Sequence, residues 1–377
     1  MTFYLVIFCA LWGIFLVSAV RGETIASLEF VALAIFVVVA GQRFETGNDW
    51  LIYRDHYLAL QQFGLSGGDN PQFPEFEPLY VLSAWLSGKL FSFQTFLFIV
   101  TAFNGLVLFR FARFWGASFA GVAAVYYAWI YLATQMATTR YSLAMSFIFI
   151  ALMCVLEGRK VLAYLLILLA TGFHFFSLAF LPIVFLLHRK LNLRLAIFTL
   201  IGGFLCVHLV LAAVGAGALD WMPFSEKIVF YLSQATVPQI SMGSLGYIVL
   251  NLAFFLWVMT SGGDGDKLEL VRWSVFYLIF FQVAAWMLPV LWNRVQIFVV
   301  IIQACVLSKY IVERQNLVVI FAGALLSLAT LTRSLSDPAF ISYVPYQSFW
   351  VDKVLMNDAR ADGEDRFYQA IEENRAR

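Results

Sequence analysis

The chain has 377 residues, of which 62% are hydrophobic and 12% are charged, and its formal net charge is +1. Soluble domains are only about 45–50% apolar, so this composition excludes an ordinary soluble protein. A net charge this small does not suggest a nucleic-acid partner, and we expect none. Barrel strands alternate apolar and polar residues, whereas these apolar runs are unbroken. We therefore expect an all-α, polytopic integral membrane protein.

Apolar runs divided by charged or turn-forming residues follow one another along most of the chain. Because a helix needs about 20 mostly apolar residues to cross a bilayer, they predict about 11–13 transmembrane helices, some of them broken or re-entrant. We expect a single transmembrane domain over residues 1–350, with external loops at 42–93 and 214–243, and a polar C-terminal tail at 351–377. The predicted spans are residues 3–20, 25–41, 94–109, 117–136, 141–156, 161–187, 195–213, 244–260, 272–291, 295–312 and 316–333.

Two apolar stretches do not fit an ordinary span. Residues 78–93 are short and contain Lys89, which favours a re-entrant segment or one that lies in the membrane interface. Residues 161–187 are too long for one span, and Gly172 and His174 lie at their middle. We therefore expect two short helices that meet near His174.

The lysines and arginines predict the orientation. We place the acidic segment 42–78 outside, let residues 78–93 return to the same side, and break 161–187 in two. Twelve cations then lie inside and seven outside, which is the usual bias. The outside cations go against this bias, so their positions need another explanation. Ionisable groups near the membrane are costly and are often functional. The inside set is Arg21, Arg110, Arg113, Arg159, Lys160, Arg189, Lys190, Arg194, Lys267, Arg272, Lys309 and Arg314; the outside set is Arg43, Arg54, Lys89, Arg140, Lys227, Arg294 and Arg333.

Arg43 and Asp49 directly follow the second predicted span. They can be the solvated charges of an ordinary loop. They can also form part of a site in which Arg43 binds an anion and Asp49 acts as a base or as the partner of the arginine. Gly47 and Asn48 form a turn that can bring Asp49 back toward Arg43.

Glu77 and Arg140 both stand at predicted helix starts. Glu77 precedes Pro78, so it is either an ordinary acid at a helix N-terminus or a functional carboxylate held at the membrane surface. Thr138 or Thr139 can cap a helix whose first turn contains Arg140. Because a cation is unfavourable at the positive end of a helix, we expect Arg140 to bind a phosphate there.

The remaining candidates each have two interpretations. His174 is either a structural hydrogen-bonding group or, at the predicted break, an acid, a base or a diphosphate contact. Arg294 is either an anchor at the membrane interface or a site residue near the Pro289 break. Lys227 and Tyr231 lie in an amphipathic stretch of an external loop, which is either an interface helix or a gate for a lipid-borne substrate.

The chain contains no GxGxxG, Walker or HExxH motif, and we expect neither a cofactor nor a metal. The predicted outer face contains several arginines and carboxylates. Such groups suit an anionic substrate with an apolar tail that is presented from the lipid.

The order of these motifs resembles the EpsG/Wzy family of polysaccharide polymerases, over about residues 40–300. The family usually has GxD at the first aspartate, which Gly47-Asn48-Asp49 fits, whereas Tyr141 stands where Gln is usual. The matching motifs are R-x5-D at Arg43 and Asp49, EPLY from Glu77, TR-x2-LAMS at Arg140, GFHFFSLAFLP around His174, the amphipathic EKIVFYL, and NR at Arg294.

This resemblance implies a GT-C-like, metal-independent glycosyltransferase of the bacterial inner membrane with its active site facing the periplasm. Its donor would be a glycan on undecaprenyl diphosphate, and its acceptor one repeat unit on the same lipid. A chain-length regulator and a flippase would be protein partners. The diphosphate would be neutralised by Arg140 and Arg294 and then by Arg43, and the glycan contacts would include Lys227 and Tyr231. The acceptor proton would go to Asp49, Glu77 or His174.

Two other functions are alternatives. An integral-membrane glycan acyltransferase would use His174 as a base and would need a tunnel to the cytoplasm. A lipid-linked oligosaccharide flippase would line a cavity through the membrane with charges and would show internal repeats. We find no repeat, and the charges cluster at one predicted face. The sequence therefore favours the polymerase.

Overall fold

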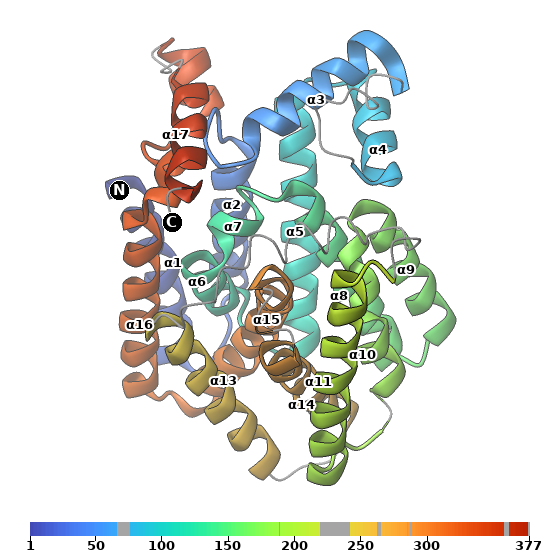
Figure 1. Ribbon diagram of the computed structural model, residues 1–377. Helices are drawn as coiled ribbons and strands as arrows, with labels where there is room; N and C mark the ends of the chain where they lie inside the picture. Colours follow the sequence, from blue (N-terminus) through green and yellow to red (C-terminus); the bar gives the residue numbers. More distant parts are fainter. Residues whose placement is uncertain are drawn as a thin grey trace. The chain divides into compact units, whose positions relative to one another are not determined.

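A computed structural model of the protein describes residues 1–65, 76–187, 189–218, 242–261, 265–284, 286, 289–357 and 362–375 (Figure 1). Within these ranges the chain is helical and forms no β-strand, which confirms the all-α fold class. The chain divides into two compact units, each described by itself below. Unit 1 comprises Met1–Leu181 and Ala304–Arg377, and unit 2 comprises Pro182–Gln303.

Six of the described helices are long and apolar enough to cross a membrane, and shorter apolar helices accompany them, which confirms a polytopic membrane protein. The long helices are α1 (Thr2–Arg21), α5 (Phe93–Trp115), α8 (Thr139–Leu156), α11 (Leu193–Gly215), α15 (Pro289–Arg314) and α16 (Leu317–Ser336). The shorter apolar helices are α2 (Ala26–Gly41), α6 (Phe119–Trp129), α9 (Lys160–Phe173), the pair η2 (Phe175–Phe180) and α10 (Leu181–Leu186), and most of α13 (Met242–Thr260).

The predicted break in residues 161–187 is confirmed. Helix α9 ends at Phe173, and His174 has an extended backbone (φ −156°, ψ 114°) before the 3₁₀ helix η2. The short segment at 78–93 is likewise no span. It forms α4 (Pro78–Gly88), whose 11 residues rise only about 16 Å, roughly half of the hydrocarbon core.

The single span predicted at 117–136 is wrong. The chain forms α6 and then a separate turn, α7 (Tyr131–Thr134), because the backbone at Ile130 leaves the helical region (φ −141°, ψ −7°). The break directs Tyr131 toward α2, where its hydroxyl donates a 2.5 Å hydrogen bond to the carbonyl oxygen of Phe36. A buried polar contact to another helix thus replaces continued helix, which hydropathy alone does not reveal.

The segment expected as an external loop at 42–93 contains an amphipathic helix, α3 (Trp50–Phe63), as well as α4. One face of α3 buries Tyr53, Tyr57 and Leu60, at helical spacing. These side chains form an apolar cluster with α4, α5 and α8 that includes Tyr80. The cluster fixes the starts of α4 and α8, where charged residues of the candidate site stand.

Unit 2 contains α11, α13, α14 (Asp266–Ala284) and the first part of α15, with α14 packed against both α11 and α13. The span predicted at 272–291 has wrong bounds: α14 begins at Asp266, whose charge suits a helix N-terminus, and ends at Ala284. Pro289 begins α15, because proline is well tolerated in the first turn of a helix.

The C-terminal part of unit 1 leaves α16 and forms two short helices, η3 (Pro338–Tyr343) and η4 (Phe349–Leu355), before α17 (Gly363–Arg375). Asp337 begins η3 by accepting a hydrogen bond from the Ala339 amide at 2.9 Å. Helix α17 lies against η3 and α3, beside the connection from α2 to α3 (Figure 1).

Candidate active site

Arg43 lies two residues beyond the end of α2, and it is buried, with 1% of its surface exposed. Its Nη1 donates to the carbonyl oxygen of Ala40 at 2.8 Å, and its Nη2 donates to Oγ1 of Thr139 at 3.2 Å. Its Nε has no hydrogen-bond partner among the described residues. Arg43 is therefore a buried cation whose described contacts are with neutral groups.

Arg140 is the second residue of α8 and follows the residue that Arg43 contacts. Its guanidinium forms an ion pair with Glu77 and donates through Nε to the hydroxyl of Tyr53 at 3.3 Å. The same group lies over the ring of Phe76, 4.2 Å from the ring centroid. Arg43 and Arg140 thus converge on the first turn of α8, where the unpaired amides and the helix dipole add further positive potential.

Glu77 stands directly before α4, whose first residue is Pro78, as the sequence indicated. Its carboxylate is engaged at both oxygens. Oε2 pairs with Arg140, and Oε1 accepts a hydrogen bond from the Phe175 amide at 3.1 Å. Glu77 therefore ties the first turn of α8 to the break that follows α9.

His174 occupies that break and is buried. Its Nδ1 accepts a 3.3 Å hydrogen bond from the Phe176 amide, which requires an unprotonated Nδ1. Its ring meets the ring of Tyr141 edge to face, with centroids 5.1 Å apart. Tyr141 is the residue after Arg140, so His174 belongs to the same neighbourhood.

Asp49 directly precedes α3 and is half-buried. Its carbonyl oxygen accepts a hydrogen bond from the amide of Tyr53 at 3.0 Å. Burial raises the pKa of the Tyr53 hydroxyl, the positive charge of Arg140 lowers it, and the negative charge of Asp49 raises it. The charges of both Arg140 and Asp49 therefore act on the Tyr53 hydroxyl.

Gly47 brings this loop against the segment that leads into α8. Its φ of +108° is strained for other residues, and a Cβ atom there would collide with the backbone oxygen of Met136. The connection from α2 to α3 therefore passes directly beside the start of α8. This close approach explains how Arg43 reaches Thr139 although the two residues are far apart in sequence.

Sequence reasoning missed three residues of this neighbourhood, Tyr53, His56 and Phe76, and it considered Thr139 only as a possible helix cap. His56 is buried with its ring 4.3 Å from that of Phe76, and burial together with the charge of Arg140 lowers its pKa to about 4. Tyr53 and His56 are three residues apart on one face of α3, and this spacing was the signal that could have identified them.

Three other candidates are not among the described residues of unit 1. Arg294 lies in α15 within unit 2, in the sixth position of the helix, and is half-buried. Lys227 and Tyr231 lie outside the described residues.

Within the described ranges, no three His, Cys, Asp or Glu side chains lie close enough to hold a metal ion. The chain does contain one DxD triplet, a motif that binds metals in some glycosyltransferases, at Asp264–Asp266 in unit 2. Asp266 begins α14, and Asp264 is outside the described residues. In unit 1 the site's positive charge comes from the two guanidinium groups and the start of α8. Such an arrangement can bind a phosphate-type anion beside two carboxylates and an imidazole.

Comparison with known proteins identifies the family. A model of the EpsG family matches residues 28–348, most of the chain, and the chain belongs to that family. The EpsG family is a family of Wzy-like exopolysaccharide polymerases, so the chain is placed among membrane polysaccharide polymerases. Neither the search of curated proteins nor the search of solved structures gave a match.

Proposed function

We propose that this member of the EpsG family is a Wzy-type, GT-C-like glycosyltransferase that joins repeat units carried on undecaprenyl diphosphate. In the proposed reaction, a sugar hydroxyl of the acceptor attacks the anomeric carbon of the donor glycan. A new glycosidic bond forms there, and the bond from that carbon to the diphosphate oxygen breaks. The hydroxyl proton passes to an enzyme carboxylate, and undecaprenyl diphosphate leaves with the bonding electrons.

One observation carries this proposal, the convergence of Arg43 and Arg140 on the first turn of α8. A diphosphate leaving group departs readily once its developing charge is neutralised. Arg43 is buried without a carboxylate in contact among the described residues, and so it gains most from a bound anion. Arg140 offers a second guanidinium one residue from the hydroxyl that Arg43 contacts, and the α8 amides add donors.

Asp49 is the base in this proposal. Both oxygens of Glu77 are engaged, one by a guanidinium and the other by an amide. The Nδ1 of His174 is likewise engaged by an amide. Glu77 then orients Arg140, and His174 donates through Nε2 to the substrate. Arg294, Lys227 and Tyr231 are proposed as contacts with glycan or lipid.

The site faces the periplasm, and both substrates arrive from the lipid of the inner membrane. The positive-inside distribution of the cations and the acidic character of residues 42–78 support this orientation. Neutralisation by guanidinium groups supplies the charge compensation that metal-dependent glycosyltransferases obtain from a divalent cation. A flippase that delivers the repeat unit and a chain-length regulator are the expected protein partners.

Purified protein in liposomes, supplied with lipid-diphosphate-linked repeat units, tests the proposal. We expect a ladder of longer glycans together with released undecaprenyl diphosphate. Asp49→Asn should lower the rate about 10²- to 10⁴-fold, the range for loss of a general base. Asp55→Asn, on the exposed side of α3, should stay within about twofold of the wild-type rate. A folded wild type that forms no ladder would overturn the polymerase, and acyl transfer or lipid translocation in its place would identify an alternative.

A further inference from the structure

The last described helix of the chain begins directly against the connection that carries Arg43 and Asp49. The amide of Gly363, the first residue of α17, donates to Oε2 of Glu45 at 3.1 Å. A Cβ atom added to Gly363 would lie 2.6 Å from the Cβ of Glu45, so only a glycine permits this approach. The match to the EpsG family ends at residue 348, and α17 therefore lies beyond it.

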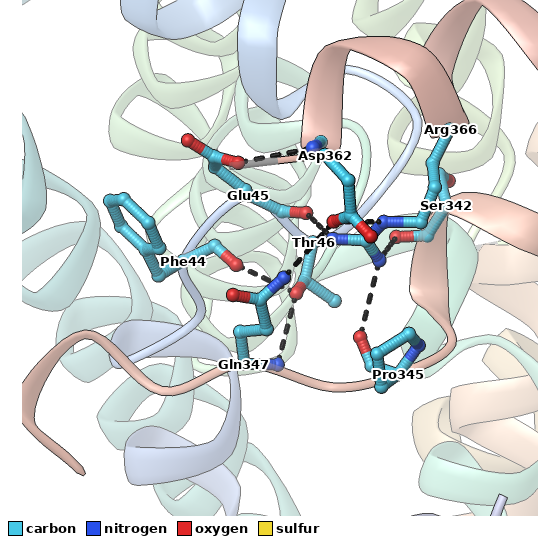
Figure 2. A network of polar contacts seen from close by, with 9 residues as sticks. Phe44, Glu45, Thr46, Ser342, Pro345, Gln347, Asp362 and Arg366 are labelled. Atoms are coloured by element: carbon cyan, nitrogen blue, oxygen red, sulfur yellow. Dashed lines mark hydrogen bonds and ion pairs between the residues drawn. The ribbon is translucent and has the colours of Figure 1, made fainter. Parts of the chain in front are cut away.

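Arg366, in the first turns of α17, is buried, with 7% of its surface exposed. Its Nη2 donates to the carbonyl oxygen of Glu45 at 2.9 Å. Its Nη1 donates to the carbonyl oxygens of Ser342 and Pro345, at 3.3 and 3.2 Å. Its Nε pairs with Asp362 at 3.0 Å, as Figure 2 shows. One guanidinium thus holds three backbone carbonyls from two segments that are about 300 residues apart in sequence.

The same two segments are joined by a ladder of further hydrogen bonds, also drawn in part in Figure 2. The Phe44 amide donates to the carbonyl oxygen of Gln347 at 2.9 Å, and the Gln347 amide donates to Oγ1 of Thr46 at 3.2 Å. Arg43 itself forms an antiparallel bridge with Ser348. The backbone of the candidate site is therefore built jointly by residues 43–49 and 342–348.

Buried carbonyls without donors are costly, and a guanidinium with its donors in a fixed fork can satisfy several at once. Arg366 lies where α17 contacts both segments, residues 43–49 and 342–348. Arg43 is two residues before the carbonyl that Arg366 holds, and Asp49 is four residues after it. A shift of the backbone at Glu45 would therefore move both Arg43 and Asp49.

We propose that Arg366 is a positioning residue of the active site, an inference that rests on the function proposed above. It fixes the connection that carries Arg43 and Asp49, and it acts through that connection without contact to substrate. The contacts also assign a location to α17. Hydrogen bonds of about 3 Å cannot reach across a hydrocarbon core of about 30 Å, so α17 lies on the same face of the membrane as the site.

The location can be tested without any activity measurement. Gln62, at the end of α3, and Asp365, in α17, are both exposed. Each is replaced by cysteine in a chain whose native Cys9 and Cys206 have been changed to serine, and intact cells or sealed vesicles are treated with a membrane-impermeant maleimide. Both cysteines should be labelled from the same side. Labelling from opposite sides would overturn the placement of α17, whatever the protein catalyses.

The positioning role is tested with Arg366→Gln, Arg366→Lys and, as the matched control on the exposed face of the helix, Asp365→Asn. Arg366→Gln should raise amide hydrogen exchange in residues 43–49 at least 10-fold and lower kcat/KM of the folded enzyme about 10- to 100-fold. A change of about 10- to 100-fold corresponds to the loss of roughly one charge-assisted hydrogen bond. Arg366→Lys keeps the cation with fewer directed donors and should recover part of both losses.

The outcomes separate this proposal from the proposed function. A structural role alone would lower the amount of folded protein and leave kcat/KM per folded molecule unchanged. Wild-type exchange and wild-type kcat/KM in Arg366→Gln would overturn the positioning role. If the wild type forms no ladder, the proposed function fails. The exchange experiment still decides whether Arg366 fixes this connection, and the labelling experiment still decides the location of α17.

Discussion

Replacing Arg140 by lysine gives the sharpest test of the arginine site, because it keeps the positive charge and removes the planar guanidinium group. In the structure, the guanidinium pairs with Glu77, donates to the Tyr53 hydroxyl at 3.3 Å and lies over Phe76 at 4.2 Å. A lysine can keep the ion pair, but it lacks the Nε donor and the planar group. The lost hydrogen bond is worth about 1 kcal/mol and the lost ring contact about 1 kcal/mol.

These contacts orient the cation toward the start of α8, so their loss should appear in catalysis. About 2 kcal/mol corresponds to a roughly 30-fold fall in kcat/KM. Arg140→Ala also removes the charge, for which we expect a fall of about 10²- to 10³-fold or more. The assay is release of undecaprenyl diphosphate by protein shown to be folded. Arg113→Lys, an exposed arginine at the end of α5, is the control. If Arg140→Lys keeps kcat/KM within twofold of the wild type, the guanidinium geometry has no role in the reaction.

Three further predictions follow from the same neighbourhood. Glu77→Gln keeps an oxygen that can accept the hydrogen bond from the Phe175 amide, but it removes the charge that balances Arg140. The KM for the donor should therefore fall, while kcat stays within about threefold of the wild type. A fall in kcat of about 10²-fold or more would instead make Glu77 the base. Gly47→Ala should lower the free energy of unfolding by about 2 kcal/mol or more, seen as a lower Tm, because it combines a strained φ with a backbone collision. Gly13→Ala in α1 is the control: this position has open space around it, and the change should be neutral or stabilising. The pKa of His56 is lowered to about 4 from an unfolded value near 6.5, so the folded state resists protonation. The free energy of unfolding should be unaffected by this group above pH 6.5 and should fall as the pH drops toward 4. The loss should be about 2 kcal/mol at pH 5. Thermal unfolding at pH 7 and pH 5 should show this loss in the wild type and not in His56→Gln.

Local chemistry made part of the site predictable from the sequence. The start of α4 behind Glu77 and Pro78, the position of Arg140 in the first turn of α8, and the break at His174 all depend on residues adjacent in the chain. A proline in a first turn has the same effect in most folds. Thr138 precedes α8 as the sequence predicted, but its side chain makes no capping hydrogen bond and its hydroxyl donates to the carbonyl oxygen of Ala133 at 3.0 Å. Such signals place residues at helix ends, where charged residues of a membrane protein can meet.

The partners of those residues could not be predicted, because they depend on packing. Glu77 and Arg140 are 63 residues apart, and nothing in either motif indicates that they form an ion pair. Tyr53 reaches Arg140 only because the aromatic face of α3 is buried on α4 and α5. The break at Ile130 has the same kind of cause, since it follows from a contact between Tyr131 and α2.

The C-terminal region gives the clearest case of this limit. A polar tail beyond the last span carries no sequence signal of a role in the site, yet Arg366 within it is buried against the connection from α2. Tyr343 likewise lies in the core of unit 1, where its hydroxyl donates to the carbonyl oxygen of Leu132 at 3.2 Å. Contacts between distant segments decide both placements, and hydropathy and charge patterns describe each segment alone.

The two site arginines differ in how their charges are balanced, and this difference indicates what the site is built to receive. Arg140 is balanced by Glu77, with 19% and 17% of the two side chains exposed, so this pair is stable without substrate. Arg43 has only neutral acceptors among the described residues, and its Nε is unsatisfied. Burying an unpaired cation costs several kcal/mol, which the fold of unit 1 must offset elsewhere. In the reaction proposed above, an anion beside Arg43 recovers that energy only while it is bound, and the gain grows as negative charge develops on the leaving diphosphate. We therefore expect the arginine that is most costly in the empty protein to contribute most to the proposed transition state.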